Sequence, residues 1–225
     1  MASAFFGQNE PMSSPASPLL RTIVYVDSFN LYYGALKRTP FKWLDLEKLF
    51  SLVLPRNDIK AIKYFTAKME STTHKPSRAT NQQLYLRALG TLPRVEIHFG
   101  RFLTTTTRAA LADPTVRPRT VEVIKTEEKG SDVNLGTHLL LDAFDDAFDL
   151  AVVVSNDSDL LLPIQLVRER FKKRVGILNP HRKPAQSLKM NSDWMWPLRQ
   201  GPLSAAQFPN ELSDANGPFR KPPTW

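Results

Sequence analysis

The chain has 225 residues, of which 42% are hydrophobic, so it can bury the core of one ordinary domain. It contains no cysteine, which excludes disulfide bonds and thiolate zinc sites and fits a reducing compartment, so we expect a cytoplasmic protein. The N-terminus lacks the charged start of a secretory signal, and no apolar run approaches the ~20 residues that cross a membrane. The net charge of +8 permits nucleic-acid binding without requiring it.

The predicted elements alternate between strands and helices. We expect a disordered leader at 1–20, one folded domain at 21–199 and a proline-rich flexible tail at 200–225. In chain order, the patterns predict strands at 22–26, 59–65, 95–99, 121–123, 150–154 and 174–178, and helices at 30–37, 43–54, 77–89, 131–146, 160–171 and 185–190, with a mobile loop at 104–118. This alternation favours an α/β sandwich with a mainly parallel sheet, in which ligands bind beyond the carboxyl ends of the strands.

Charge is unevenly distributed in the second half of the chain. Residues 142–159 contain six aspartates and no basic residue, whereas residues 168–189 contain eight basic residues and one acid. An acidic region beside a basic one is what a metal site serving a phosphate backbone requires. From charge alone, however, a solvated helix face and an ordinary lysine-rich loop explain this distribution more readily.

Two of the most hydrophobic predicted strands end in aspartate. The strand at 22–26 leads to Asp27, and the strand at 150–154 leads to Asp157 and Asp159. If both strands are central and parallel, these carboxylates converge, and two of them about 4 Å apart repel by roughly 4 kcal/mol at an effective dielectric near 20. Convergence therefore requires a bound proton or a cation, and oxygen ligands suit Mg²⁺ or Mn²⁺.

Each acidic residue also has an ordinary structural explanation. Asp132 follows Gly130 and Ser131 in the first turn of a predicted helix, where an acid favours the helix dipole regardless of function. Asp157 belongs to a Ser-Asn-Asp-Ser run that is typical of turns, and Asp159 is a candidate N-cap for the next helix. Together, at the ends of apolar strands, these residues favour a shared site.

Three segments of the chain resemble the signatures of NYN domains, which are PIN-like nucleases. They are Val-Tyr-Val-Asp-Ser-Phe-Asn at 24–30, Lys-Gly-Ser-Asp-Val-Asn-Leu at 129–135 and Val-Ser-Asn-Asp-Ser-Asp-Leu at 154–160. The segment 187–194 resembles the closing segment of the bacterial LabA-like branch, although Asn191 and Ser192 depart from its pattern. The resemblance covers about 21–199 and implies a PIN-like three-layer α/β/α sandwich.

The resemblance also implies a mechanism, carried over by position. Asp27, Asp132, Asp157 and Asp159 would hold one or two Mg²⁺ or Mn²⁺ ions, and Asn30 would orient a ligand. The metal would activate a water molecule that hydrolyses RNA phosphodiester bonds. The family therefore implies a divalent-metal-dependent endoribonuclease that acts on single-stranded RNA, with the preference for RNA over DNA resting on the resemblance alone.

Four basic residues are candidates for binding the RNA backbone. Lys172, Lys173 and Arg174 form the densest part of the basic stretch, and Lys129 is the first residue of the second signature, where a solvated lysine is an equal alternative. Binding through such contacts should weaken as salt increases. A second copy of this chain, and a protein partner for the tail, stay open as further partners.

Three aromatic residues near the first signature have an ordinary structural explanation. Phe29, Tyr32 and Tyr33 follow the first signature and are more typical of helix packing than of base stacking. Two alternative functions stay open. The first is a non-catalytic RNA-binding or regulatory protein on the same fold. The second is a different α/β phosphohydrolase with Asp27 as its nucleophile.

Overall fold

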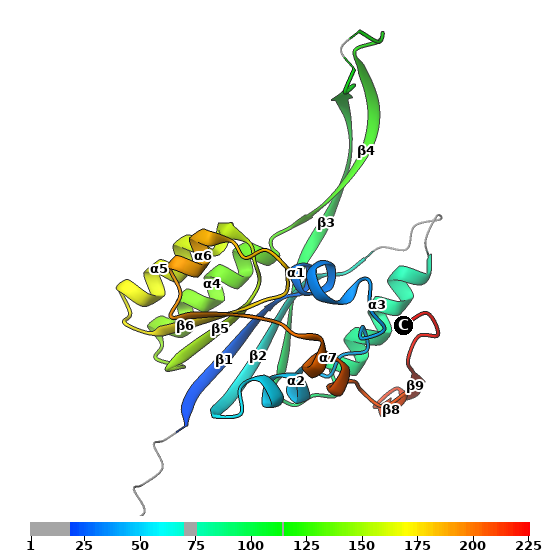
Figure 1. The fold of residues 1–225 in the computed structure, drawn as a ribbon. Coiled ribbons are helices and arrows are strands. Elements are labelled where there is room, and N and C mark those ends of the chain that lie inside the picture. The colour runs from blue at the N-terminus through cyan, green and yellow to red at the C-terminus, as the bar shows by residue number, and fades with distance from the viewer. Residues whose placement is uncertain (1–18, 70–75, 114) are drawn as a thin grey trace, which may run out of the picture.

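The computed structural model describes residues 19–69, 76–113 and 115–225, so most of the expected leader lies outside the described residues. Its central sheet has seven strands in the order β4-β3-β2-β1-β5-β6-β7 (Figure 1). These are β1 (Leu20–Asp27), β2 (Asn57–Ala67), β3 (Val95–Ala110), β4 (Thr120–Lys129), β5 (Leu150–Val154), β6 (Arg174–Asn179) and β7 (Trp194–Pro197). Neighbouring strands of this sheet run parallel except β3 and β4, which confirms the predicted mainly parallel sheet.

Helices cover both faces of the sheet and make three layers (Figure 1). One face carries α1 (Ser28–Leu31), the π-helix η1 (Tyr32–Leu36), α2 (Leu46–Val53), α3 (Pro76–Leu89) and α7 (Gln200–Ala205). The other face carries α4 (Ser131–Phe144), the 3-10 helix η2 (Ser158–Leu160), α5 (Leu161–Glu169) and α6 (Gln186–Met190). In the part of the chain that the model describes, no helix is long and apolar enough to span a membrane.

Each central strand contributes to both hydrophobic cores. Val24 and Val152 lie in the core under α2 and α3, whereas Tyr25 and Val153 lie in the core under α4 and α5. All four side chains are fully buried. Because a strand between two helix layers is buried on both faces, β1 and β5 read as continuous apolar runs in the sequence.

The amino edge of the sheet uses part of the acidic run in structural ion pairs. The Arg21 guanidinium lies 3.0 Å from an Asp146 carboxylate oxygen and 2.7 Å from one of Asp149. Lys63 Nζ lies 2.7 Å from a carboxylate oxygen of Asp142 in α4. Asp146 and Asp149 therefore lie at the amino edge, whereas Asp142 joins α4 to the middle of β2, where Lys63 lies opposite Tyr25 of β1.

The segment 200–225 differs from the expected flexible tail. Beyond α7 it forms a hairpin of β8 (Glu211–Asp214) and β9 (Gly217–Arg220). Phe219 is buried against the Trp43 ring, and Trp43 Nε1 donates a hydrogen bond to the Pro209 carbonyl at 2.8 Å. The sequence pattern did not predict this packing, because it depends on a few widely spaced aromatic side chains and not on a periodic run of apolar residues.

The loop expected at 104–118 is also shorter than predicted. β3 and β4 pair from Arg101 opposite Lys129 to Ala110 opposite Thr120, as a two-stranded ribbon that projects from the body (Figure 1). The hydroxyls of Thr104 and Thr126 lie 3.0 Å apart across it. The threonine run is therefore strand, which agrees with the β propensity of branched side chains.

Candidate active site

Asp27 is the last residue of β1 and is almost fully buried. Its Oδ1 accepts a hydrogen bond from the Asn30 backbone N–H at 3.0 Å, so its side chain caps α1. Its Oδ2 accepts bonds from Asn30 Nδ2 at 2.6 Å and from Ser155 Oγ at 2.9 Å. A carboxylate held at both oxygens keeps a fixed orientation at the carboxyl edge of the sheet.

The turn after β5 joins this network from the neighbouring strand. Ser155 Oγ accepts a hydrogen bond from the Asp157 backbone N–H at 3.1 Å, and Asn30 Oδ1 accepts one from the Asn156 N–H at 3.2 Å. The Asp157 carboxylate caps η2 by accepting the Asp159 N–H at 3.0 Å. Hence Asp157 is the helix cap here, while Asp159 is exposed and is not the N-cap of α5, which is Leu160.

Asp132 reaches the same edge because β4 runs antiparallel to β3. The pair Arg101–Lys129 lies beside the carboxyl end of β2, and α4 begins only two residues after Lys129. Gly130 makes this turn with a φ of 98°, a conformation that glycine adopts without strain. The second signature therefore places Asp132 in the first turn of α4, at the end of the helix that faces the site.

The electrostatics of these carboxyl groups show that they share one environment. Burial raises the pKa of the half-buried Asp132 to about 6, and the charges of Asp27, Asp157, Glu128 and Asp159 add to the increase. Burial also raises the pKa of Asp27, against the hydrogen bonds it accepts, and the charge of Asp157 adds to it. Asp132 therefore lies within electrostatic range of all three other predicted aspartates.

The chemistry of this donor set fits a hard divalent cation. Every candidate ligand is an oxygen atom, and the pKa values of Asp27 and Asp132 are raised first by burial and then by the charges of neighbouring aspartates. The buried Ser131 hydroxyl beside Asp132 has no hydrogen-bond partner among the described residues. Among the described residues, no three acidic or histidine side chains lie close enough together to hold a metal ion.

The predicted basic residues do not gather at this edge. Lys172 and Lys173 precede β6 and Arg174 begins it, so all three lie at the amino edge, opposite the aspartates. Lys173 Nζ forms an ion pair with Asp146 there. Lys129 alone lies on the side of the site, exposed and 3.4 Å from a Glu127 carboxylate oxygen.

Two other basic residues from the same stretch lie beside the aspartates. Arg182 and Lys183 follow the carboxyl end of β6, and both are exposed. Asn156 Nδ2 donates a hydrogen bond to the Lys183 carbonyl at 3.1 Å, which ties this loop to the turn that carries Asp157. The stretch 168–189 reads as one block in the sequence, but β6 separates its two halves by the length of a strand.

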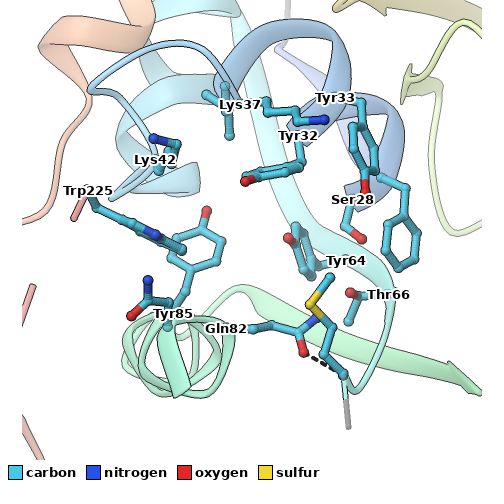
Figure 2. A pocket seen from close by; sticks show the side chains of 14 residues that line it. Ser28, Tyr32, Tyr33, Lys37, Lys42, Tyr64, Thr66, Gln82, Tyr85 and Trp225 are labelled. Atoms are coloured by element: carbon cyan, nitrogen blue, oxygen red, sulfur yellow. Dashed lines mark hydrogen bonds between the residues drawn. The ribbon is translucent and has the colours of Figure 1, made fainter. Parts of the chain in front are cut away.

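An aromatic cavity that was not expected lies next to α1, and its wall includes Ser28, the residue after Asp27. Its volume is about 120 Å³, and Figure 2 shows its labelled side chains. Tyr32 and Tyr33 line it, and Tyr32 also packs against the core as expected. They are joined by Tyr64 from β2, Tyr85 from α3 and Trp225. Spacing in the sequence gave no sign of this grouping, because its members come from distant segments.

The fold and the carboxyl edge together define a class of protein. A three-layer α/β/α sandwich with acidic residues after two central parallel strands has the architecture of PIN-like nuclease domains. The model of the NYN domain family matches residues 21–198, and the chain belongs to this family. Family membership supports a nuclease at a coarse level and leaves the reaction of this chain open.

Two further comparisons extend this assignment. The chain is 33% identical over 238 residues to 6-hydroxy-3-succinoylpyridine 3-monooxygenase HspA of Pseudomonas putida, and the match covers 92% of this chain and 75% of that protein. It also resembles the crystal structure of a protein of unknown function from Vibrio parahaemolyticus. The TM-score is 0.54 at 16% identity, with 84% of this chain and 97% of that one covered, so this likeness supports the fold alone.

Proposed function

We propose that this chain is a divalent-metal-dependent ribonuclease that hydrolyses phosphodiester bonds in RNA. The observation that carries the proposal is that Asp27, Asp132, Asp157 and Asp159 follow or face the carboxyl ends of the central strands; burial first, and then the charges of the other three aspartates, raise the pKa of Asp132. Such a concentration of negative charge at a functional edge suits a cation. Membership of the NYN family supports a nuclease, and single-stranded RNA is the substrate we propose.

Each residue has a distinct role in this proposal. Asp27, Asp132, Asp157 and Asp159 would hold one or two Mg²⁺ or Mn²⁺ ions. Bound there, the cation would lower the pKa of water and offset the charge that develops on the phosphate. Asn30 fixes the rotamer of Asp27 through two hydrogen bonds.

The basic side chains have a positioning role in the same proposal. Lys129, Arg182 and Lys183 lie on the side of the site and would hold the RNA backbone there. Lys172, Lys173 and Arg174 would contact only a strand long enough to reach the amino edge. Binding that depends on contacts between these cations and the phosphate backbone weakens as the salt concentration increases.

The test is cleavage of labelled single-stranded RNA with Mg²⁺ or Mn²⁺, comparing the wild type with Asp157→Asn. We expect the variant and an EDTA control to lose at least about a hundredfold in rate, a loss typical of removing a group that stabilises charge in the transition state. Asp145→Asn, an exposed aspartate at the far end of α4, is the matched control. Binding of RNA without cleavage in every protein would replace this proposal by a binding or regulatory role.

The HspA relative supports a second candidate function, which is oxidation of a small hydroxylated pyridine. In a monooxygenase, one atom of O₂ enters the substrate, and the other leaves as water with two electrons from a donor such as NADH. The test is O₂ uptake with a hydroxypyridine acid and NADH, with the metal varied. Uptake coupled to loss of the ring substrate, without RNA cleavage, would favour this candidate over the nuclease.

A further inference from the structure

We propose that the cavity beside the aspartates binds a single six-membered aromatic ring that carries an anionic group. The ring is either a pyrimidine base of an RNA nucleotide or a free pyridine acid. The inference deepens the proposed function by assigning a ligand to the cavity next to Asp27. Only the identity of the molecule that supplies the ring rests on that proposed function. Binding itself is measured without turnover, so the two can fail separately.

The size and the walls of the cavity fit one planar ring. Its volume of about 120 Å³ is close to the ~150 Å³ of an engineered apolar cavity that accepts benzene. Tyr32, Tyr64, Tyr85 and Trp225 surround the space in Figure 2. Aromatic side chains stack on the faces and edges of heterocyclic rings, and such stacking is the main source of affinity for an unpaired base.

The walls are held in place before any ligand arrives. The Gln82 side chain of α3 accepts a hydrogen bond from the Met69 N–H at 2.8 Å and donates one to the Ala67 carbonyl at 2.9 Å, which joins α3 to the end of β2. The Tyr85 hydroxyl donates to the Leu44 carbonyl at 2.9 Å. A rigid aromatic wall loses little conformational entropy on binding, which favours a specific ring over loose apolar contact.

The charge at the cavity indicates an anionic substituent. Among the described lining residues, the charged side chains are Lys37 and Lys42, and both are basic. Lys37 Nζ lies 4.7 Å from the centre of the Tyr33 ring, so it stays at the wall of the cavity. A phosphate or carboxylate on the bound ring would meet these two cations, whereas an uncharged ring would leave them without a partner in the ligand.

The position of the cavity links it to the reacting edge. Ser28 lines the cavity and directly follows Asp27 in the chain. The charge of Asp27 contributes to the raised pKa of Tyr64, the first cause being burial, so the two groups lie within electrostatic range. A ring in the cavity would therefore lie within electrostatic range of Asp27, while Lys37 and Lys42 would hold its anionic group at another part of the wall.

Isothermal titration calorimetry with EDTA present tests the proposal on the whole chain. The probes are uridine monophosphate and hydroxynicotinic acid, with uridine as a ring without an anion and ribose phosphate as an anion without a ring. We expect one of the first two to bind at least about tenfold more tightly than both partial probes, in line with the size of one stacking interaction. The probe that binds identifies the source of the ring.

Variants separate the site from a general effect on the fold. Trp225→Ala and the double change Lys37→Gln with Lys42→Gln should each weaken binding about tenfold, and Trp225→Phe should restore most of it. Phe144→Ala, an exposed aromatic on the other face of the sheet, is the matched control. The proposal is overturned if neither full probe binds, or if ribose phosphate binds as tightly as uridine monophosphate.

Discussion

Replacing Asp132 by Asn should stabilise the metal-free protein near neutral pH, because a carboxylate with a raised pKa is disfavoured in the fold. The pKa rises from 3.8 to about 6, and each pKa unit corresponds to about 1.36 kcal/mol, or roughly 3 kcal/mol for a shielded group. Asp132 is only half-buried, so solvent screening reduces this to about 1.5 kcal/mol. Loss of a favourable charge in the first turn of α4 removes about 0.5 kcal/mol, which leaves a net gain of about 1 kcal/mol.

The pH dependence has a defined sign. A raised folded pKa means that the destabilisation by Asp132 is complete above about pH 6 and absent once the carboxyl is protonated in both states, below about pH 4. The advantage of Asp132→Asn should therefore be largest near pH 8 and fall to about half near pH 5. Urea unfolding in EDTA measures it, with Glu122→Gln, an exposed acid far out on the β3–β4 ribbon, as control.

Metal should reverse the order of stability. A cation that binds the folded state stabilises it in proportion to the logarithm of its concentration over Kd, and the wild type holds one more anionic ligand than Asp132→Asn. In saturating Mn²⁺ the wild type should be the more stable protein. A variant that is less stable in EDTA, or a wild type that does not respond to Mn²⁺, would refute this account of the carboxyl groups.

Three further predictions follow from contacts at the two edges and in the last segment. Ser155→Ala removes the hydroxyl shared by the carboxylate of Asp27 and the backbone of the next turn, so it should lower stability by about 1–3 kcal/mol in urea unfolding and slow RNA cleavage more than tenfold. Lys183→Gln should weaken RNA binding and reduce its salt dependence by about one phosphate contact, whereas Arg174→Gln at the amino edge should change a short RNA's affinity little. Phe219→Ala should lower the free energy of unfolding by about 3 kcal/mol, while Glu211→Ala on the exposed side of the same hairpin should be nearly neutral; equal midpoints would show that the hairpin does not support the core.

The sheet and its acidic edge were predictable because local pattern and position both point to them. β1 and β5 are continuous apolar runs, and parallel strands bring their carboxyl ends to one edge, so the meeting of Asp27 and Asp157 follows from pattern alone. The position of Asp132 could not be predicted from pattern alone, because it depends on the antiparallel pairing of β4 with β3 and on the turn at Gly130. There the resemblance to the NYN signatures supplied what periodicity could not.

Other parts of the molecule depend on contacts between distant residues and left no local sign. The last segment packs through single aromatic side chains such as Phe219 around Trp43, spaced without a period. Lys172 and Lys183 also belong to one basic stretch in the sequence, although β6 separates them in the fold. Charge density along a chain does not show which edge of the sheet a loop reaches, because the chain crosses from one edge to the other along each strand.

The candidate site has two parts, which are the four aspartates and the aromatic cavity. The four aspartates lie inside the segment that matches the NYN family, whereas Trp225, which closes the aromatic cavity, lies beyond residue 198. The other residues of the wall, among them Ser28 and Tyr64, lie inside the matched segment, so the aspartates and the cavity share most of their framework and Trp225 is the wall residue contributed from beyond it. A family whose fold supports nucleases and a relative named for a pyridine substrate are compatible, because a fold does not determine the reaction that its site performs.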